Sequence, residues 1–145
     1  LPSPEPSLID VRPFLERMVQ LALHQHPSPN IRIVLEKVQE DLMAFADESL
    51  MTQVMTNLLK NAFVHNIDKG MIRVEITSSS IRFGNTGADV ALDDKRIFER
   101  FYQGSRKREG STGLGLAIVH AICRQCRLQV RYRFLDGMHW LEVYK

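Results

Sequence analysis

The sequence predicts an α+β domain, built as a two-layer α/β sandwich in which helices cover one face of a mixed, mostly antiparallel sheet. One observation is a long helical periodicity near the middle of the chain, over 47–66. Another is that most expected strands are neighbours in sequence, as hairpins are, rather than alternating singly with helices. The third is size, because 145 residues with 44% hydrophobic content suit a single domain with its own core.

The N-terminal part predicts a linker followed by a helix and two strands. Residues 1–7, LPSPEPS, carry three prolines and are expected to be an extended linker, with one domain over 8–145. From Leu8 to Gln25 apolar residues recur with helical period, with Asp10 as the N-cap. Strands are expected over 31–38 and 42–46.

The central helix, expected over 47–66, combines an apolar stripe with a polar one. Asp47 precedes it as a favourable N-cap residue. Gln53, Asn57, Asn61 and His65 recur every four residues, which places them along a single helix face. A buried amide without a partner costs about 1–3 kcal/mol. Either the fold or a polar ligand must therefore satisfy this stripe.

The C-terminal half alternates hairpins with a glycine-rich region. Strands are expected over 71–77 and 81–83, joined by SSS. Most of the glycines lie between Gly84 and Gly115, beside the basic run 106–108, which is typical of a functional loop. A helix is expected from Gly113 to Gln125 with Thr112 as its cap, and then a hairpin of 127–134 and 138–144 across Asp136-Gly137.

Composition excludes several classes of function. A formal net charge of +2 gives no reason to expect nucleic acid or direct membrane contact, and no apolar run is long enough to span a bilayer. Cys123 and Cys126 fall inside an expected helix, where His120 does not complete a zinc site, so we interpret them as reduced cysteines of a cytoplasmic domain. Three other histidines are predicted to pack ordinarily or face solvent: His24, His26 and His139.

Two features could hold a phosphorylated ligand. The segment GSTGLGLAIV (110–119) places glycines at a helix N-terminus, which favours an anion, although a simple glycine hinge is the better explanation of this segment taken by itself. Asn57 and Asn61 offer carbonyl oxygens one turn apart, which suit Mg²⁺ beside a triphosphate. The alternative is that both amides bond to a neighbouring strand. Phe98 and Phe101 are either core aromatics or a cover for a nucleobase.

Four segments in order resemble one family. NLLKNAFVHN, FGNTG, IFERFY and GSTGLGLAIV resemble the N box, first glycine box, F box and second glycine box of the catalytic ATP-binding domain of bacterial sensor histidine kinases, in the GHKL superfamily. The resemblance covers nearly the whole chain from Leu8 onward and implies a Bergerat-type ATP-binding fold. It also implies that ATP and Mg²⁺ are the cofactors.

The resemblance implies roles for individual residues. Asn61 would hold Mg²⁺ and Asn57 would support the phosphates, so these two form the catalytic pair. His65 and Asn85 would contact adenine, while Phe98 to Tyr102 would anchor a lid over the nucleotide. The full implied nucleotide-binding set is Asn57, Asn61, His65, Asn85, Gly87, Phe98, Phe101, Tyr102, Gly110, Thr112, Gly113, Leu114, Gly115 and Leu116.

The chain departs from the family pattern at several positions. Asn85 replaces the aspartate that reads the adenine amino group, and Asp89 replaces the second glycine of that box. Val64 stands where Lys or Arg is common, and Gln103 stands where arginine is frequent. These departures favour an alternative function, a degenerate nucleotide-sensing or docking module without transfer activity.

Asn57 separates the branches of the superfamily. The ATP-hydrolysing members resemble one another in having Glu at this place, and an amide cannot act as that base. The favoured function is therefore donation of the γ-phosphoryl group to a histidine on a separate dimerisation and phosphoacceptor domain of the same protein, with a response regulator as an indirect partner. An autonomous ATPase ranks last. We expect the isolated chain to be a monomer, from a parent that is compatible with an inner-membrane anchor.

Overall fold

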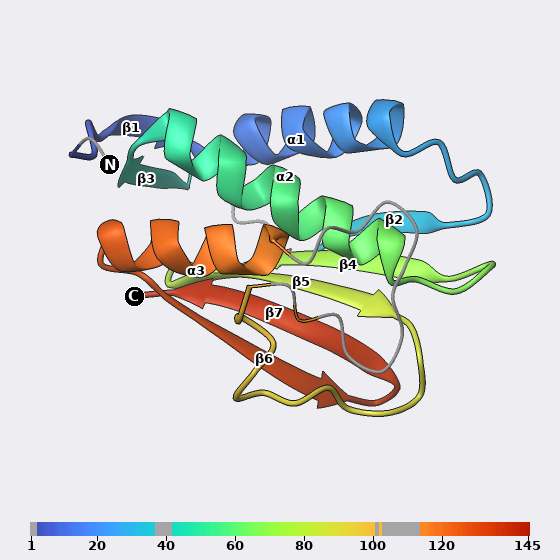
Figure 1. The fold of residues 1–145 in the computed structure, drawn as a ribbon. Coiled ribbons are helices and arrows are strands. Elements are labelled where there is room, and N and C mark those ends of the chain that lie inside the picture. Colours follow the sequence, from blue (N-terminus) through green and yellow to red (C-terminus); the bar gives the residue numbers. More distant parts are fainter. Residues whose placement is uncertain (1–2, 37–41, 101, 103–113) are drawn as a thin grey trace.

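The computed structural model describes residues 3–36, 42–100, 102 and 114–145. Figure 1 shows three helices on one face of a five-stranded sheet, with a separate two-stranded sheet beside α1 and α2. The predicted two-layer α/β sandwich is confirmed. The helices are α1 (Val11–Gln25), α2 (Glu48–Val64) and α3 (Gly115–Gln125). The strands are β1 (Ser7–Asp10), β2 (Arg32–Glu36), β3 (Met43–Ala46), β4 (Met71–Ile76), β5 (Ser80–Thr86), β6 (Gln129–Leu135) and β7 (Met138–Tyr144).

The large sheet has the order β2-β4-β5-β7-β6. Only β2 and β4 are parallel, and the other neighbours pair antiparallel. The parallel pair requires a crossover, which β3 and α2 supply between β2 and β4. The mixed, mostly antiparallel sheet therefore combines two hairpin pairs, β4–β5 and β6–β7, with the antiparallel β5–β7 pair that joins them and the parallel crossover pair β2–β4.

The inner face of this sheet, which the helices cover, is apolar because the strands alternate. Its buried side chains pack with those of α1, α2 and α3 into a single core. The buried strand residues of that core are Ile72, Val74, Ile76, Phe83, Tyr132, Leu141 and Val143.

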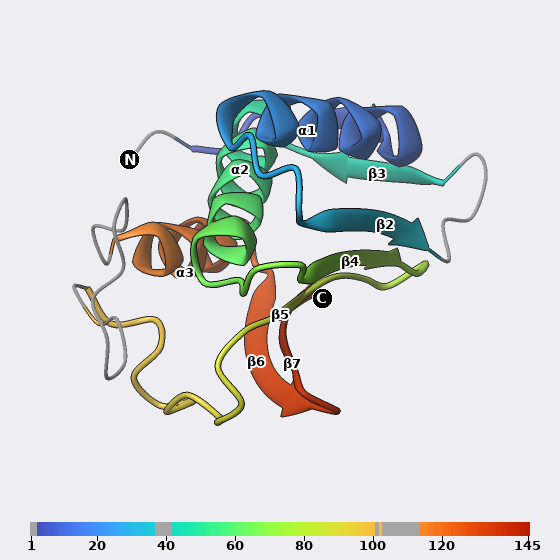
Figure 2. The same ribbon diagram turned by 90° about the vertical axis from the view of Figure 1, so that its right-hand side faces the viewer.

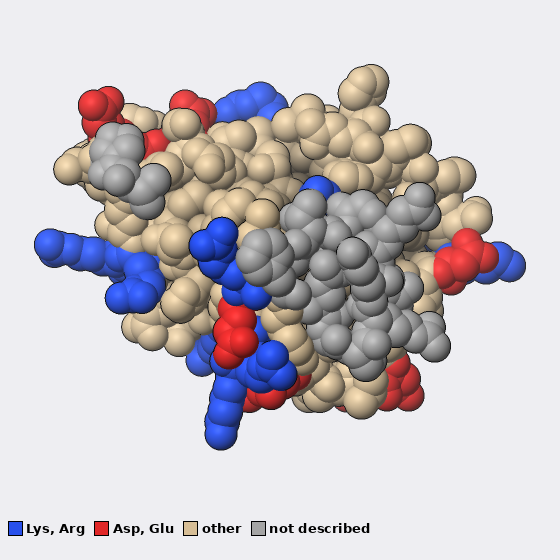
Figure 3. Space-filling model, in the orientation of Figure 1, with Lys and Arg blue, Asp and Glu red and all other residues tan. Residues whose placement is uncertain are grey.

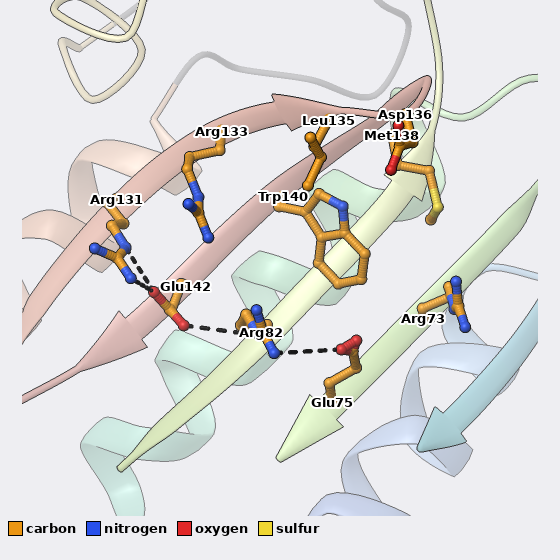
Figure 4. A pocket seen from close by; sticks show the side chains of 10 residues that line it. All are labelled: Arg73, Glu75, Arg82, Arg131, Arg133, Leu135, Asp136, Met138, Trp140 and Glu142. Carbon is orange, nitrogen blue, oxygen red and sulfur yellow. Dashed lines mark hydrogen bonds and ion pairs between the residues drawn. The ribbon is translucent and has the colours of Figure 1, made fainter. Parts of the chain in front are cut away.

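The outer face of the sheet is charged. In register across four strands, Glu75, Arg82, Glu142 and Arg131 form a ladder of alternating charge. Arg82 Nη2 lies 3.5 Å from Glu75 Oε1, and Arg82 Nε lies 3.7 Å from Glu142 Oε2, as Figure 4 shows. Beside this ladder Trp140 lies over the backbone of β5, in a shallow hollow of about 300 Å³.

The N-terminal segment corrects one expectation. Asp10 is the N-cap of α1, as predicted, although its side chain makes no capping hydrogen bond. The residues just before it are not helical but form β1, which pairs antiparallel with β3 and matches Leu8 with Phe45. The strand begins at Ser7, the last residue of the expected linker. A partner strand far along the chain decides this, so local periodicity could not show it.

The central helix matches its prediction closely. Asp47 is the N-cap of α2, and its carboxylate Oδ1 accepts a hydrogen bond from Leu50 N at 3.0 Å. The other oxygen, Oδ2, accepts from Glu5 N at 2.8 Å, which ties the chain before β1 to this helix. These two backbone donors hold the pKa of Asp47 below its ordinary value.

Strand boundaries differ from prediction in the C-terminal half. β5 continues through Gly84 to Thr86, three residues that were expected to lie in the glycine-rich loop. They stay in the sheet because β7 pairs with all of them. The predicted turn at Asp136-Gly137 is confirmed, and both residues have positive φ, 51° and 76°.

Candidate functional site

Three chain segments that the sequence singles out meet at one end of the sandwich. They are the C-terminal half of α2, the end of β5 and the start of α3, which face the viewer in Figure 2. A Cβ placed on Gly87 would lie 2.8 Å from the carbonyl oxygen of His65. A Cβ placed on Gly115 would lie 3.1 Å from Asn57 Oδ1. The structure therefore brings both glycine boxes against the N-box helix.

The polar stripe of α2 faces this meeting point. Gln53 is exposed, whereas Asn57, Asn61 and His65 are half-buried. Asn57 Nδ2 donates to the carbonyl oxygen of Gln53 at 2.8 Å, which leaves Oδ1 directed toward Gly115. Within the described residues neither Asn57 nor Asn61 bonds to a strand through its side chain. The alternative that strands satisfy both amides is wrong for this part of the chain.

Asn85 lies on the inner face of the sheet near the end of β5. Its side chain is 3% exposed, and Nδ2 donates to the carbonyl oxygen of Thr86 at 2.9 Å. No described residue donates a hydrogen bond to Oδ1. Thr86 takes one of the two Nδ2 hydrogens, and a buried amide oxygen that is open favours a ligand that carries an N–H group.

A hydrogen-bonded cluster that the sequence did not reveal joins the end of α2 to β4 and β5. Thr86 Oγ1 donates to Asn66 Oδ1 and accepts from Met71 N at 2.8 Å. Asn66 Nδ2 donates to the carbonyl oxygens of Ala62 and Met71, at 3.1 and 3.2 Å. Its side chain thus satisfies backbone groups at a helix end. The cluster fixes the end of α2 relative to Asn85 and Gly87.

The F box contributes to the core and to contacts with α3. Ile97 is 4% exposed, and the ring of Phe98 stacks on His120 of α3 with centroids 5.5 Å apart. The guanidinium of Arg96 lies over the ring of Tyr102, 4.9 Å from the ring centroid, in a cation–π contact. Phe98 is thus a packing residue at this position, and its role toward a nucleotide stays a prediction.

The described part of α3 begins at Gly115 with Leu114 at the N-cap, later than the expected start at Gly113. Leu116 packs against the core from the first turn. Four implied nucleotide-binding residues lie outside the described residues: Phe101, Gly110, Thr112 and Gly113. Thr112 is also the residue that was expected to cap the helix.

His139 packs in the interior, one of the two alternatives predicted for it, and it makes specific hydrogen bonds there. It is 9% exposed and lies opposite Asn85 in the β5–β7 register. Both of its ring nitrogens are within hydrogen-bond distance of a partner, Tyr132 Oη and the carbonyl oxygen of Ala88, each at 2.7 Å. Sequence reasoning had no signal for these contacts, because the partners are distant in the chain.

Cys123 lies inside α3 as predicted, whereas Cys126, also expected inside the helix, lies at its C-cap. Cys123 is buried in α3, and burial raises its pKa to about 11. Burial also raises the pKa of Cys126, which lies at the C-cap. Neither forms a disulfide, and no group of three or more His, Cys, Asp or Glu among the described residues could hold a metal ion. No helix in the described ranges is long and apolar enough to cross a membrane.

The donor set of the site fits a magnesium nucleotide. Amide oxygens such as those of Asn57 and Asn61 are hard ligands of the kind that Mg²⁺ accepts while it shares phosphate oxygens. The start of α3 presents unpaired backbone N–H groups beside Asn57, which favours phosphate there. The open Oδ1 of Asn85 suits the amino group of an adenine.

Comparison with known proteins identifies the family. Residues 46–138 match the family model described as Histidine kinase-, DNA gyrase B-, and HSP90-like ATPase. The sensor histidine kinase RppB of Synechocystis sp. is 32% identical over 120 residues, which cover 77% of this chain and 26% of that protein. The probable sensor histidine kinase TcrY of Mycobacterium tuberculosis is 34% identical over 105 residues, covering 66% of this chain and 22% of its own length.

Solved structures share the fold. The nucleotide-free catalytic domain of histidine kinase ThkA superimposes with a TM-score of 0.79 at 21% identity, covering 97% of this chain and 96% of that one. The mycobacterial sensor histidine kinase MprB gives a TM-score of 0.80 at 18% identity, with coverages of 94% and 95%.

The chain therefore belongs to the histidine kinase-, DNA gyrase B- and HSP90-like ATPase family, as a catalytic ATP-binding domain of the sensor histidine kinase type. It spans about a fifth to a quarter of the length of the curated relatives it matches.

Proposed function

We propose that this domain binds ATP together with Mg²⁺ and donates the γ-phosphoryl group to a histidine on a separate dimerisation domain of the same protein. The arrangement of Asn57 supports this most strongly. Its amide oxygen faces the start of α3, where phosphates would lie, and its Nδ2 is held by Gln53. An amide orients and neutralises but cannot remove a proton. The acceptor would then have to bring its own base, as a histidine does.

The remaining residues bind and orient. Asn61 would supply an oxygen to Mg²⁺, and the helix N-terminus at Gly115 would face phosphate. Asn85 would accept from the adenine amino group through Oδ1, because no described residue donates to that oxygen. An open acceptor at Oδ1 favours adenine over guanine, which presents a carbonyl oxygen at the same place. Positioning and charge neutralisation are what phosphoryl transfer demands of a protein, and bound Mg²⁺ supplies most of the neutralising charge.

The direct experiment is a calorimetric titration of the chain with ATP, with and without Mg²⁺. We expect binding that strengthens with Mg²⁺ and a preference for ATP over GTP. No binding at millimolar ATP would refute nucleotide binding by this chain. Transfer is tested separately, by incubating the parent protein with radiolabelled ATP and locating the label on histidine.

The substitution Asn61→Ala sharpens the metal assignment. We expect it to remove most of the Mg²⁺-dependent gain in ATP affinity, about tenfold or more. The free energy of unfolding should change by less than about 1 kcal/mol, because the side chain is half-buried and bonds to no described residue. Gln53→Ala, on the exposed start of the same stripe, is the matched control and should leave affinity unchanged. Equal Mg²⁺ dependence in Asn61→Ala and the parent chain would contradict the assignment.

A second candidate function is a nucleotide-sensing module without transfer. It is favoured by Asn85, a neutral acceptor where the family has a carboxylate, and by Val64, which removes a phosphate-side cation. ATP binding combined with no label on the parent's histidine would support this candidate. Radiolabel on that histidine would exclude it.

A further inference from the structure

His139 is placed beside the proposed adenine-reading residue by the register of the sheet. It lies directly opposite Asn85 in the antiparallel β5–β7 pair, on the inner face. Opposite side chains on one face have Cβ atoms about 4.5–5.5 Å apart, so the imidazole is a direct neighbour of the Asn85 amide. Asn85 and His139 are the polar residues in an otherwise apolar set of buried inner-face strand positions.

The contacts of His139 define which nitrogen carries the proton. A carbonyl oxygen can only accept, so the bond between Nε2 and Ala88 O places the hydrogen on Nε2. Nδ1 then accepts from the hydroxyl of Tyr132. That hydroxyl oxygen in turn accepts from Leu92 N at 3.0 Å. One continuous chain of hydrogen bonds therefore runs from Leu92 through both side chains to Ala88.

Packing holds this chain of hydrogen bonds rigid. The rings of Tyr132 and His139 stack with centroids 5.9 Å apart, and Phe134 packs on the imidazole at 4.7 Å. Tyr132 is 8% exposed, and burial raises its pKa, although the bond from Leu92 opposes the rise. The hydroxyl therefore keeps its proton at neutral pH and is able to donate to His139.

The backbone groups that Tyr132 and His139 bind belong to the segment that follows Asn85. Ala88 O and Leu92 N lie at two points of this segment, and Ala88 itself is exposed. Gly87 passes between α2 and the hairpin, since an added Cβ would lie 2.8 Å from His65 O and 3.1 Å from His139 Cδ2. The segment is thus clamped between the end of α2 and the β6–β7 hairpin.

We propose that His139 and Tyr132 are positioning residues for nucleotide recognition, which hold the segment 87–92 so that Asn85 presents Oδ1 to the adenine amino group. This inference rests on the proposed function. Neither side chain touches the nucleotide; each acts through the backbone of the first glycine box and through the neighbour relation of His139 to Asn85.

The test uses the 145-residue chain and its Tyr132→Phe and His139→Gln variants, with Tyr144→Phe as the matched control. Tyr144 lies on the same hairpin, but among the described residues its hydroxyl bonds to the exposed Gln129 alone, at 3.2 Å. His139→Gln retains an amide donor for Ala88 O and an amide oxygen that can accept from Tyr132, but it presents them on a flexible side chain instead of a rigid ring. Affinities for ATP and GTP with Mg²⁺ are measured by calorimetry, and exchange of the Leu92 amide is measured by NMR.

We expect Tyr132→Phe to weaken ATP binding about tenfold and GTP binding less, so that the ATP-to-GTP preference falls. In Tyr132→Phe the Leu92 amide should also exchange faster than in the parent chain. The affinities and the exchange rate of His139→Gln should lie between those of Tyr132→Phe and the parent chain. Tyr144→Phe should match the parent chain in every measurement. A purely structural role would lower the urea midpoint but leave the nucleotide preference of the folded protein unchanged.

Two outcomes overturn the inference in distinguishable ways. If the parent chain binds ATP and Tyr132→Phe keeps the same ATP-to-GTP preference, the positioning role is wrong while the proposed function stands. If the parent chain binds no ATP, the proposed function falls and the positioning role falls with it, whatever the Leu92 exchange shows.

Discussion

The two faces of the five-stranded sheet differ in how they use polar residues. On the outer face, charged side chains alternate across strands, with Glu75, Arg82 and Glu142 forming ion pairs beside Trp140 (Figure 4). On the inner face nearly every strand residue is apolar and packs under the helices. Its buried polar positions, Asn85 and His139, lie opposite one another at the end where α2 and α3 meet.

The difference indicates which polar residues of the sheet point to a binding function. On the outer face the carboxylates of Glu75 and Glu142 are buried, but arginines in register across the strands pair with them, so they need no ligand. A polar group on the covered face must find a partner or a ligand. The helix side of the molecule also differs from the charged outer face of the sheet. In Figure 3 most of the described surface over α2 and α3 is formed by uncharged residues.

The largest expected effect comes from the centre of the inner face. Phe83 is 2% exposed, and Phe83→Ala should lower the free energy of unfolding by about 3–5 kcal/mol through lost burial and a cavity. Urea denaturation followed by circular dichroism measures this. Phe83→Leu, which retains most of the volume, is the control and should cost clearly less. A cost below about 1 kcal/mol for the alanine variant would contradict the conclusion that the inner face contributes more to stability than the outer face.

A smaller effect is expected where β5 faces outward beneath Trp140. A Cβ on Gly84 would lie 2.7 Å from Cε3 and Cζ3 of the indole, so Gly84→Ala should cost about 1–3 kcal/mol by overpacking. Trp140→Leu in the same chain should remove most of this penalty, because the clash is with the ring. A double-mutant cycle on unfolding free energies tests the coupling. Additive effects of the two substitutions would contradict it.

The charged ladder should contribute less again. Arg82→Met should cost about 1–2 kcal/mol, because Glu75 and Glu142 are buried, at 6% and 7% exposure, and lose a partner, while Arg131 still pairs with Glu142. Arg12→Ala breaks an exposed pair with Glu16 on α1 and should cost a few tenths of a kcal/mol, about what such helical pairs contribute. Both costs, measured by urea denaturation, should shrink in 1 M salt. A cost for Arg82→Met that matches Phe83→Ala would refute the comparison.

The smallest expected effect is a difference in reactivity between the two cysteines, which probe the core beneath α3. Burial raises the pKa of Cys123 to about 11, so its thiolate fraction stays small until the pH approaches that value. Cys126 is less buried and should react first with iodoacetamide at pH 8 in the folded protein. Mass spectrometry of tryptic peptides measures the order, and in urea both should react at similar rates. Faster labelling of Cys123 in the folded state would show that this core is open.

Local chemistry was sufficient wherever neighbours in sequence decide the structure. Asp47 caps α2 through a backbone N–H three residues away, and Asp136-Gly137 forms a tight turn from its own dihedral preferences. The alternation in β4 and β7 and the periodicity of α2 were read correctly for the same reason. The fold class followed from these elements, because their order allows few arrangements.

The sequence by itself therefore determined the fold class and the central helix with its amide stripe. The tertiary structure alone decided that Ser7–Asp10 is a strand, since β3 supplies its partner, and that β5 runs on to Thr86 beside β7. It also decided the surroundings of Asn85, because His139 reaches Ala88 across 51 residues of chain. Contacts of such separation depend on strand register, which no local pattern encodes.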